Sequence, residues 1–415
     1  MHTLLIEDAN VSLDHLPLCL TPSLKSLEVS RIPSERQIVF ASFLTMLLEQ
    51  VPGLVHLTLK PGRPLSQDIL RSSLGFSFLR RLEFMGVTGP IDFSLLKDIG
   101  AMPELEALVM DTRDAQYQPF KPDSEKSAVP TSFQRLRELT ITSGLMLMGD
   151  LIFHLHPNLG LRELSLTLVK FIGVFGVDVK GTHPSWYPVR PPAPLISTTT
   201  KKLDKVTSKA IPPVQAPPAA ELAFTWMIDQ ILSRYALELL AINHATPNSF
   251  VVPRATIDKM LSCPTLTTLK VGWKVKPLDE ILNSLDPPMP ALLEVLEFPI
   301  GNALEYESQA HVSTLRHVVE CYPHLIRLQC PIQPHSAVGP LYNPTVDPLS
   351  HGLKIFSVGG ASPSPEQQIL IASYLDYLFP TLESIQTHDG VGAVQWDYIY
   401  RLYRMCKFAR LVSRE

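Results

Sequence analysis

The chain has 415 residues and a formal net charge of -4, from 36 Lys and Arg against 40 Asp and Glu. Hydrophobic residues make up 45% of the sequence, which excludes wholesale disorder. The balanced charge gives the chain as a whole no electrostatic basis for binding nucleic acid or an anionic membrane. Leucine and proline are both abundant, at 63 and 38 residues, and their positions predict the architecture.

The N-terminus and the cysteines bear on the compartment. No basic segment precedes the first apolar residues, so no secretory signal is expected, and no apolar run reaches the roughly 18 residues of a membrane span. The cysteines are odd in number, widely spaced and without a CxxC pair, at Cys19, Cys263, Cys321, Cys330 and Cys406. We therefore expect free thiols, no metal site, no membrane association and a cytoplasmic or nuclear location.

A short phrase, Pro-x-Leu-x-x-Leu-x-apolar, recurs along the chain. Its clearest copies occupy residues 22–29, 103–110, 264–271 and 323–330. Clear and weaker copies together place the second apolar residue at Leu27, Leu57, Leu82, Leu108, Leu139, Leu164, Leu240, Leu269, Leu296, Leu328, Phe356 and Ile385. All steps between these positions but one are 25 to 32 residues long, which is close to the period of leucine-rich repeats.

The phrase and the residues between its copies predict alternating strands and helices. Leu-x-apolar has the period of two that suits a short strand with one buried face. Residues 34–50 and 365–378 carry apolar side chains at helical spacing, and Ser364 before Pro365 is a helix-start signal. The sequence therefore predicts an α/β leucine-rich-repeat solenoid of about 12 irregular repeats, with a curved parallel sheet on the concave face and helices on the convex face.

The one long step, from Leu164 to Leu240, interrupts the predicted solenoid. Residues 171–220 contain nine prolines and almost no leucine, which predicts a Pro-rich flexible insertion, or alternatively a ligand for an SH3-type groove. The expected organisation is an N-terminal part of the solenoid at 1–170, the insertion at 171–220, a C-terminal part at 221–394 and a capping helix at 395–415.

The capping helix is expected to be amphipathic. By helical spacing, one face holds Trp396, Ile399, Tyr400, Tyr403 and Cys406. The basic residues that fall largely elsewhere are Arg401, Arg404, Lys407, Arg410 and Arg414. The apolar face would cover the exposed core of the last repeat. The basic residues leave a second reading open, in which the helix binds a partner.

Sequence motifs for catalysis are not found. The chain has no P-loop, no GxSxG elbow and no HExxH, and residues 390–392 lack the third glycine of a dinucleotide fingerprint. His154 and His156 are two residues apart, which suits neither a helical metal pair nor a catalytic dyad by itself. We therefore predict no catalytic, cofactor-binding or metal-binding residue and no enzyme activity.

The solvent-facing strand positions are the candidate binding residues. On either side of the central apolar residue, side chains point away from the core onto the concave face. The candidates among them are Glu28, His56, Lys60, Arg81, Glu83, Glu138, Glu163, Lys270, Glu297, Arg327, Gln329 and His388. Their mixed charge favours a protein partner over nucleic acid, and we expect the chain itself to be a monomer.

The irregular Pro-x-Leu-x-x-Leu phrases, the Pro-rich breaks and the closing helix with Trp396 resemble the leucine-rich-repeat region of fungal F-box-type proteins. In that family an F-box docks to the adaptor of a cullin-type ubiquitin ligase, and the repeats hold the substrate. Residues 13–20 are too short for an F-box helix bundle, so no F-box is recognised here. The resemblance therefore implies a substrate-binding surface and assigns no adaptor-contact residue.

Taken together, these features favour a non-enzymatic protein-protein interaction module, in the role of the substrate-recognition arm of a ubiquitin ligase complex. An enzyme with a site near residues 171–220 and a purely structural scaffold are the alternatives.

Overall fold

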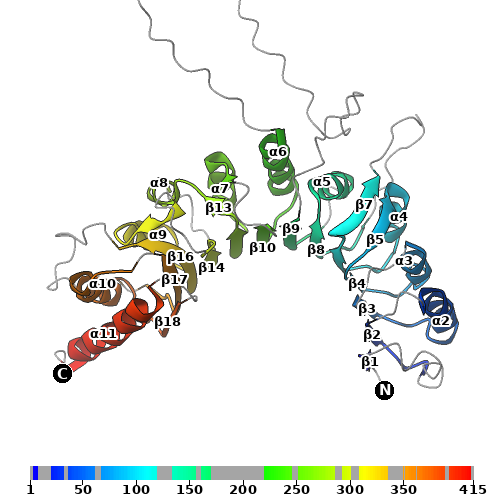
Figure 1. Ribbon diagram of the computed structural model, residues 1–415, viewed down its shortest axis with the longest axis horizontal. Helices are drawn as coiled ribbons and strands as arrows, with labels where there is room; N and C mark the ends of the chain where they lie inside the picture. The colour runs from blue at the N-terminus through cyan, green and yellow to red at the C-terminus, as the bar shows by residue number, and fades with distance from the viewer. Residues whose placement is uncertain are drawn as a thin grey trace, which may run out of the picture.

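The computed structural model describes residues 3–7, 20–31, 36–60, 67–118, 133–155, 160–169, 219–244, 251–285, 292–300, 308–334, 349, 351–360, 362–387 and 392–412. In these ranges, strands and helices build an arch. A long sheet lines its concave side, and the helices lie on its convex side (Figure 1). The two termini lie at opposite ends of the arch.

Among the described residues the sheet has 14 strands and is parallel throughout, which confirms the expected parallel α/β architecture. Its strands follow the order β1 (Thr3–Ile6), β2 (Ser26–Ser30), β3 (His56–Lys60), β4 (Arg81–Phe84), β6 (Ala107–Asp111), β8 (Glu138–Ser143), β9 (Glu163–Leu168), β10 (Leu239–His244), β12 (Thr268–Gly272), β14 (Val295–Glu297), β16 (Arg327–Gln333), β17 (Ile355–Gly360) and β18 (Ser384–Thr387), with β15 (Ala310–His311) beside β16. Two small parallel pairs are β5 (Thr88–Asp92) with β7 (Asp114–Gln118), and β11 (Val251–Val252) with β13 (Lys274–Val275).

The apolar positions predicted from the spacing form one row across this sheet. Each predicted residue, from Leu27 in β2 to Ile385 in β18, is the register partner of the next. All are at most 1% exposed except Ile385, which is partly buried in the last strand. The row also includes Leu4 of β1, which the sequence did not predict because no Pro-x-Leu phrase precedes it.

The backbone repeats the same geometry between neighbouring strands. The carbonyl of the residue just before a strand accepts two hydrogen bonds, from the first residue of the next strand and from the residue before that one. For example, Lys25 accepts from the N–H groups of Val55 and His56. The same pair recurs at every junction from β2 to β18, so the strands stack with one constant offset.

Proline lies in the turn that leads into many of the strands. Pro52 follows Val51, the residue that caps the C-terminus of a helix ending at Gln50, and the N–H of Leu54 bonds to the carbonyl of Val51 at 3.2 Å. Proline favours this second position of a tight turn because its ring fixes φ. Pro22, Pro264, Pro323 and Pro380 occupy the same place in hydrogen-bonded turns. Much of the proline excess therefore marks helix-to-strand junctions.

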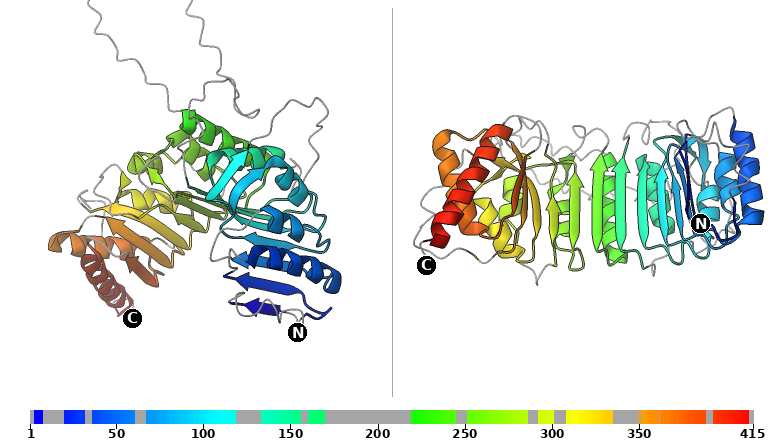
Figure 2. Two further views of the ribbon diagram at one scale, coloured as in Figure 1. Left: turned by 45° about the vertical axis from the view of Figure 1, so that its right-hand side comes forward. Right: turned by 90° about the horizontal axis from the view of Figure 1, so that it is seen from below.

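The helices cover the outer side of the sheet, except that the last one lies at the C-terminal end of the arch, as Figures 1 and 2 show. They are α2 (Gln37–Gln50), α3 (Gln67–Ser73), α4 (Phe93–Gly100), α5 (Leu145–His154), α6 (Ala219–Arg234), α7 (Arg254–Leu261), α8 (Leu278–Asn283), α9 (Thr314–Cys321), α10 (Pro365–Leu378) and α11 (Ala393–Val412). The helix-start signal at Ser364 is confirmed: its side chain and that of Gln367 form a reciprocal capping box before α10.

The sheet continues directly from β9 to β10. Six residue pairs, from Glu163 with Leu239 to Leu168 with His244, join these strands. The predicted insertion at 171–220 lies outside the described residues, except that Ala219 and Ala220 belong to the first turn of α6. The strands before and after that segment therefore belong to one continuous sheet.

The C-terminal helix α11 packs against α10 and β18. Its buried residues, Trp396, Ile399 and Tyr403, belong to the face expected from the sequence, and the other two members of that face, Tyr400 and Cys406, are half-buried. The hydroxyl of Tyr403 donates to the carbonyls of Phe379 and Leu382, at 3.0 and 3.2 Å. Burial raises the pKa of this hydroxyl, so it stays protonated and keeps donating.

Buried His351 makes the stability of the fold depend on pH. Its Nε2 donates to the carbonyl of Tyr322 at 2.9 Å, and its Nδ1 accepts from the N–H of Leu353 at 3.1 Å. The ring is therefore neutral in the fold, and burial lowers its pKa below 6.5. A proton added at Nδ1 would face the N–H of Leu353 instead of accepting from it.

We expect the free energy of unfolding to fall as the pH drops below about 6.5, because the unfolded chain then binds a proton that folded His351 resists. Urea unfolding at pH 7.5 and 5.5 measures this loss. The variant His351→Gln should lose less stability over that interval than the unmodified chain. Equal losses in the two proteins would contradict the assignment.

Candidate functional site

Two rows of side chains face outward on the concave side of the sheet, and the right-hand view of Figure 2 shows the strands of that side from below. The first row holds Ser26, His56, Arg81, Ala107, Glu138, Glu163, Leu239, Thr268, Val295, Arg327, Ile355 and Ser384. The second row holds Glu28, Thr58, Glu83, Val109, Thr140, Ser165, Ala241, Lys270, Glu297, Gln329, Ser357 and Gln386. Each row joins residues that lie far apart in sequence.

Ion pairs link the charged residues of the N-terminal half of this face. Lys60 contacts Glu28 at 2.9 Å, and this hydrogen bond raises the pKa of the Lys60 ammonium. Arg81 donates to Glu83 at 2.6 Å and to Glu138 at 2.9 Å. The contact with Glu83 is the main cause of a raised pKa of Arg81, which stays cationic. We call Glu28, Lys60, Arg81, Glu83 and Glu138 the N-terminal cluster.

The bridge from Arg81 to Glu138 spans a strand. Arg81 is in β4 and Glu138 is in β8, and β6 lies between them with Ala107 in the same row. Neighbouring strands are about 4.8 Å apart, so the bridge covers about 10 Å. The methyl group of Ala107 leaves room for the long arginine side chain above it.

A second cluster lies in the C-terminal half and centres on Glu297. Its two carboxylate oxygens contact Lys270 at 3.2 Å and Arg327 at 2.7 Å. The Nε–H of Arg327 makes no hydrogen bond, so that contact is an ion pair without hydrogen-bond alignment. The Glu297 side chain is only 13% exposed because the two cations cover it. We call Lys270, Glu297 and Arg327 the C-terminal cluster.

The remaining predicted residues lie outside these clusters. Gln329 is half-buried, and its Nε2 donates to the carbonyl of Phe298 at 2.9 Å. His56 and Glu163 are exposed in the first row. His388 lies outside the described residues.

Among the apolar residues of the two rows, three large side chains in the first row were missed by the sequence reasoning, which selected polar side chains. Leu239, Val295 and Ile355 are half-buried in the first row, and Val295 and Ile355 are the register neighbours of Arg327. The signal that could have found them is the register itself, since each is the first residue of its strand. Arginine beside apolar side chains is the composition typical of strong contacts in protein interfaces.

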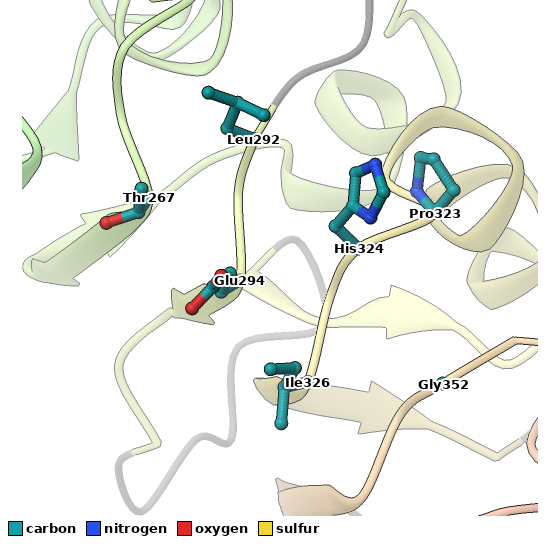
Figure 3. A pocket seen from close by; sticks show the side chains of 7 residues that line it. All are labelled: Thr267, Leu292, Glu294, Pro323, His324, Ile326 and Gly352. Carbon is teal, nitrogen blue, oxygen red and sulfur yellow. The ribbon is translucent and has the colours of Figure 1, made fainter.

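A cleft of about 470 Å³ opens at the edge of the sheet where β12, β14 and β16 begin. Figure 3 shows Pro323 and His324 on one side of it and Thr267, Leu292 and Glu294 on the other. Leu292 is 51% exposed and Ile326, which also lines the cleft, is 39% exposed. Its lining is largely apolar, which suits a side chain of a bound polypeptide.

One Cys–His contact resembles a catalytic pair in distance. The Sγ of Cys321 lies 3.6 Å from the Nε2 of His317. That Nε2 also lies 2.7 Å from the carbonyl of Leu285, which can only accept. The nitrogen therefore carries a proton and has no lone pair with which to activate the thiol. The contact anchors α9 to the end of the preceding segment.

Within the ranges given above, no group of three or more His, Cys, Asp and Glu side chains is placed to hold a metal ion. No helix of that same part of the chain has the length and apolarity to cross a membrane.

These observations define a class of protein: an α/β solenoid-like arch with a long parallel sheet and a mixed-charge concave face. Comparison with known proteins adds no relative, because no protein-family model and no curated protein matches the chain.

Proposed function

We propose that the chain is a leucine-rich-repeat solenoid that binds another protein on its concave face without catalysing a reaction, and that it serves as the substrate-recognition arm of a ubiquitin ligase complex. The observation that carries the binding function is the concave face itself, where twelve neighbouring strands from β2 to β18 present polar, charged and apolar side chains in continuous rows. The ligase role rests on the resemblance in sequence.

The ion pairs prepare this face for binding. Exposed ion pairs contribute only about 0–1 kcal/mol each to stability, so stability alone does not explain two linked clusters. They do restrict the long side chains of Lys60, Arg81 and Arg327, which reduces the entropy lost when a partner binds. The face is thus ordered before contact.

The charges of the two clusters predict how basic and acidic residues are arranged on a partner. In the N-terminal cluster, three carboxylates stand against Lys60 and Arg81, and exposed Glu163 lies beside Glu138 in the first row. In the C-terminal cluster, two cations stand against Glu297. We expect a partner with basic residues over the first cluster and, over the second, acidic residues beside an apolar anchor.

The test is affinity capture on the full chain with quantitative mass spectrometry. Partners captured by the unmodified chain should fall by roughly tenfold or more with Arg81→Glu combined with Arg327→Glu. Arg327→Glu repels the acidic residues expected over the C-terminal cluster, and Arg81→Glu removes the ion pairs that order Glu83 and Glu138. The matched control is Arg316→Glu, which removes an exposed arginine from α9 on the convex side. Circular dichroism verifies the fold of each variant.

An unchanged partner set in the double variant would contradict binding on the concave face. The same capture tests the ligase role separately. A ubiquitin ligase adaptor among the captured proteins would support it, and partners without an adaptor would restrict the proposal to protein binding.

A further inference from the structure

The helix α11 carries a second apolar face that nothing in the described residues covers. Its buried face holds Trp396, Ile399 and Tyr403. On the outer side, the exposed fractions are 79% for Val394, 50% for Tyr398, 68% for Met405, 69% for Phe408 and 54% for Val412. We call these five residues the outer stripe.

The outer stripe has the spacing of a coiled-coil seam. Its members, together with Arg401, follow steps of four and three residues from 394 to 412. At 100° per residue they fall within an arc of about 80°, and they extend along about 27 Å of helix. Leu411 is also exposed, at 52%, and lies about 60° outside this arc at the C-terminal end of the helix. Over the rest of its length the seam is narrow, which is typical of one helix packing along another, whereas a helix lying on a membrane has a broader apolar face.

Charge on α11 specifies which kind of helix can pack there. Arg401 is 73% exposed and pairs with Asp397 at 2.7 Å, and Arg404 is exposed one turn of the helix away from Lys407. Beside the stripe, Arg401 and Arg404 thus stand against the single carboxylate of Asp397. The Lys407 ammonium instead lies over the ring of the inner-face residue Tyr403, 5.8 Å from the ring centroid. The fourth cation, Arg410, is directed inward and pairs with Asp376.

A second copy of the chain is a poor occupant. The outer stripe is centred near residue 403, and Arg401 and Arg404 both lie within one turn of that centre. Packing against another α11 in either direction would bring these cations close to their own counterparts, which costs free energy. A helix with acidic residues beside its apolar seam would instead meet them with opposite charge.

We propose that α11 is a docking site for an acidic amphipathic helix of a partner protein, packed along the outer stripe. The site is separate from the rows of the concave face, because α11 lies beyond the last strand, β18, at the C-terminal end of the arch (Figure 1). The chain would then hold two proteins at once, one on the sheet and one at its C-terminal end.

The test uses a labelled 28-residue helical peptide with leucine at both seam positions and glutamate at the flanking positions of each heptad. Fluorescence anisotropy with the full chain should show saturable binding at low salt. The same peptide with lysine in place of glutamate should bind at least about tenfold more weakly. The variant Met405→Glu combined with Phe408→Glu should also weaken binding by at least about tenfold, since both side chains are exposed anchors outside the folded core.

The matched control is Ile38→Glu on α2, a residue that is 84% exposed on another helix, and it should leave binding unchanged. Arg81→Glu on the concave face should also leave it unchanged, which separates the two surfaces. No binding of the acidic peptide to the folded chain would overturn the proposal. Dimerisation of the chain that is abolished by Met405→Glu combined with Phe408→Glu would also overturn it. The same holds if the chain binds vesicles of 30% phosphatidylserine as tightly as it binds the acidic peptide and the same double variant abolishes that binding.

Discussion

Replacing Trp396 by alanine should lower the free energy of unfolding by about 3–5 kcal/mol, the usual cost of removing a large buried aromatic side chain. Trp396 is 1% exposed and belongs to the same continuous core as the leucine row of the sheet. It lies in α11, the helix that packs on the last strand β18. Its loss leaves a cavity at an end of the arch, where only one neighbouring strand supports the core.

Urea unfolding followed by circular dichroism measures this effect. Because elements of an extended array contact mainly their neighbours, the variant should show an early transition of the C-terminal end or a lower midpoint overall. Tyr398→Ala is the matched control: it removes an aromatic ring two residues away that is 50% exposed, and should change stability by less than about 0.5 kcal/mol. Similar losses in the two variants would show that the inner face of α11 does not stabilise the fold.

Replacing Arg410 by alanine should lower the free energy of unfolding by about 3 kcal/mol, because it leaves the buried carboxylate of Asp376 without its cationic partner. The guanidinium donates from Nε to Oδ2 of Asp376 at 3.0 Å and from a terminal nitrogen to Oδ1 at 2.9 Å. The Asp376 side chain is only 9% exposed, and that of Arg410 is 19% exposed. This two-point contact joins α10 to α11.

A double-mutant cycle separates the pair from its surroundings. Asp376→Leu combined with Arg410→Leu should recover most of the stability lost in Arg410→Ala, since a buried apolar pair needs no charge compensation. The exposed pair of Asp397 with Arg401 on the same helix is the comparison, and Arg401→Ala should cost less than about 0.5 kcal/mol. An Arg410→Ala variant as stable as Arg401→Ala would contradict the buried role.

The sequence predicted the sheet well because its signal is local and repeated. A leucine with an apolar residue two positions later can bury one face of a strand only against a similar neighbour, so the spacing of Leu27, Leu57 and the later members already contained the register. The proline at the turn added a second, independent mark. The strand β1 was not predicted because no proline phrase precedes Leu4, although the apolar Ile6 follows two positions later.

The candidate site was less predictable, because contacts between strands join side chains that are far apart in sequence. That Arg81 reaches Glu138 requires both the register and the small size of Ala107 between them. The burial of Glu297 depends on cations from two other strands. For α11, the sequence gives the spacing of the apolar residues but not which of them remain exposed. The structure shows that Met405 and Phe408 face outward.

The direct pairing of β9 with β10 has a consequence for how this chain can vary. The six residue pairs between these strands fix their positions independently of the number of residues that connect Leu168 to Leu239. Closing a longer connection costs little, since each doubling of its length adds only about 0.6 kcal/mol of entropy loss. The connection is therefore a place where length can be gained or lost over evolutionary time while both halves of the arch keep their alignment.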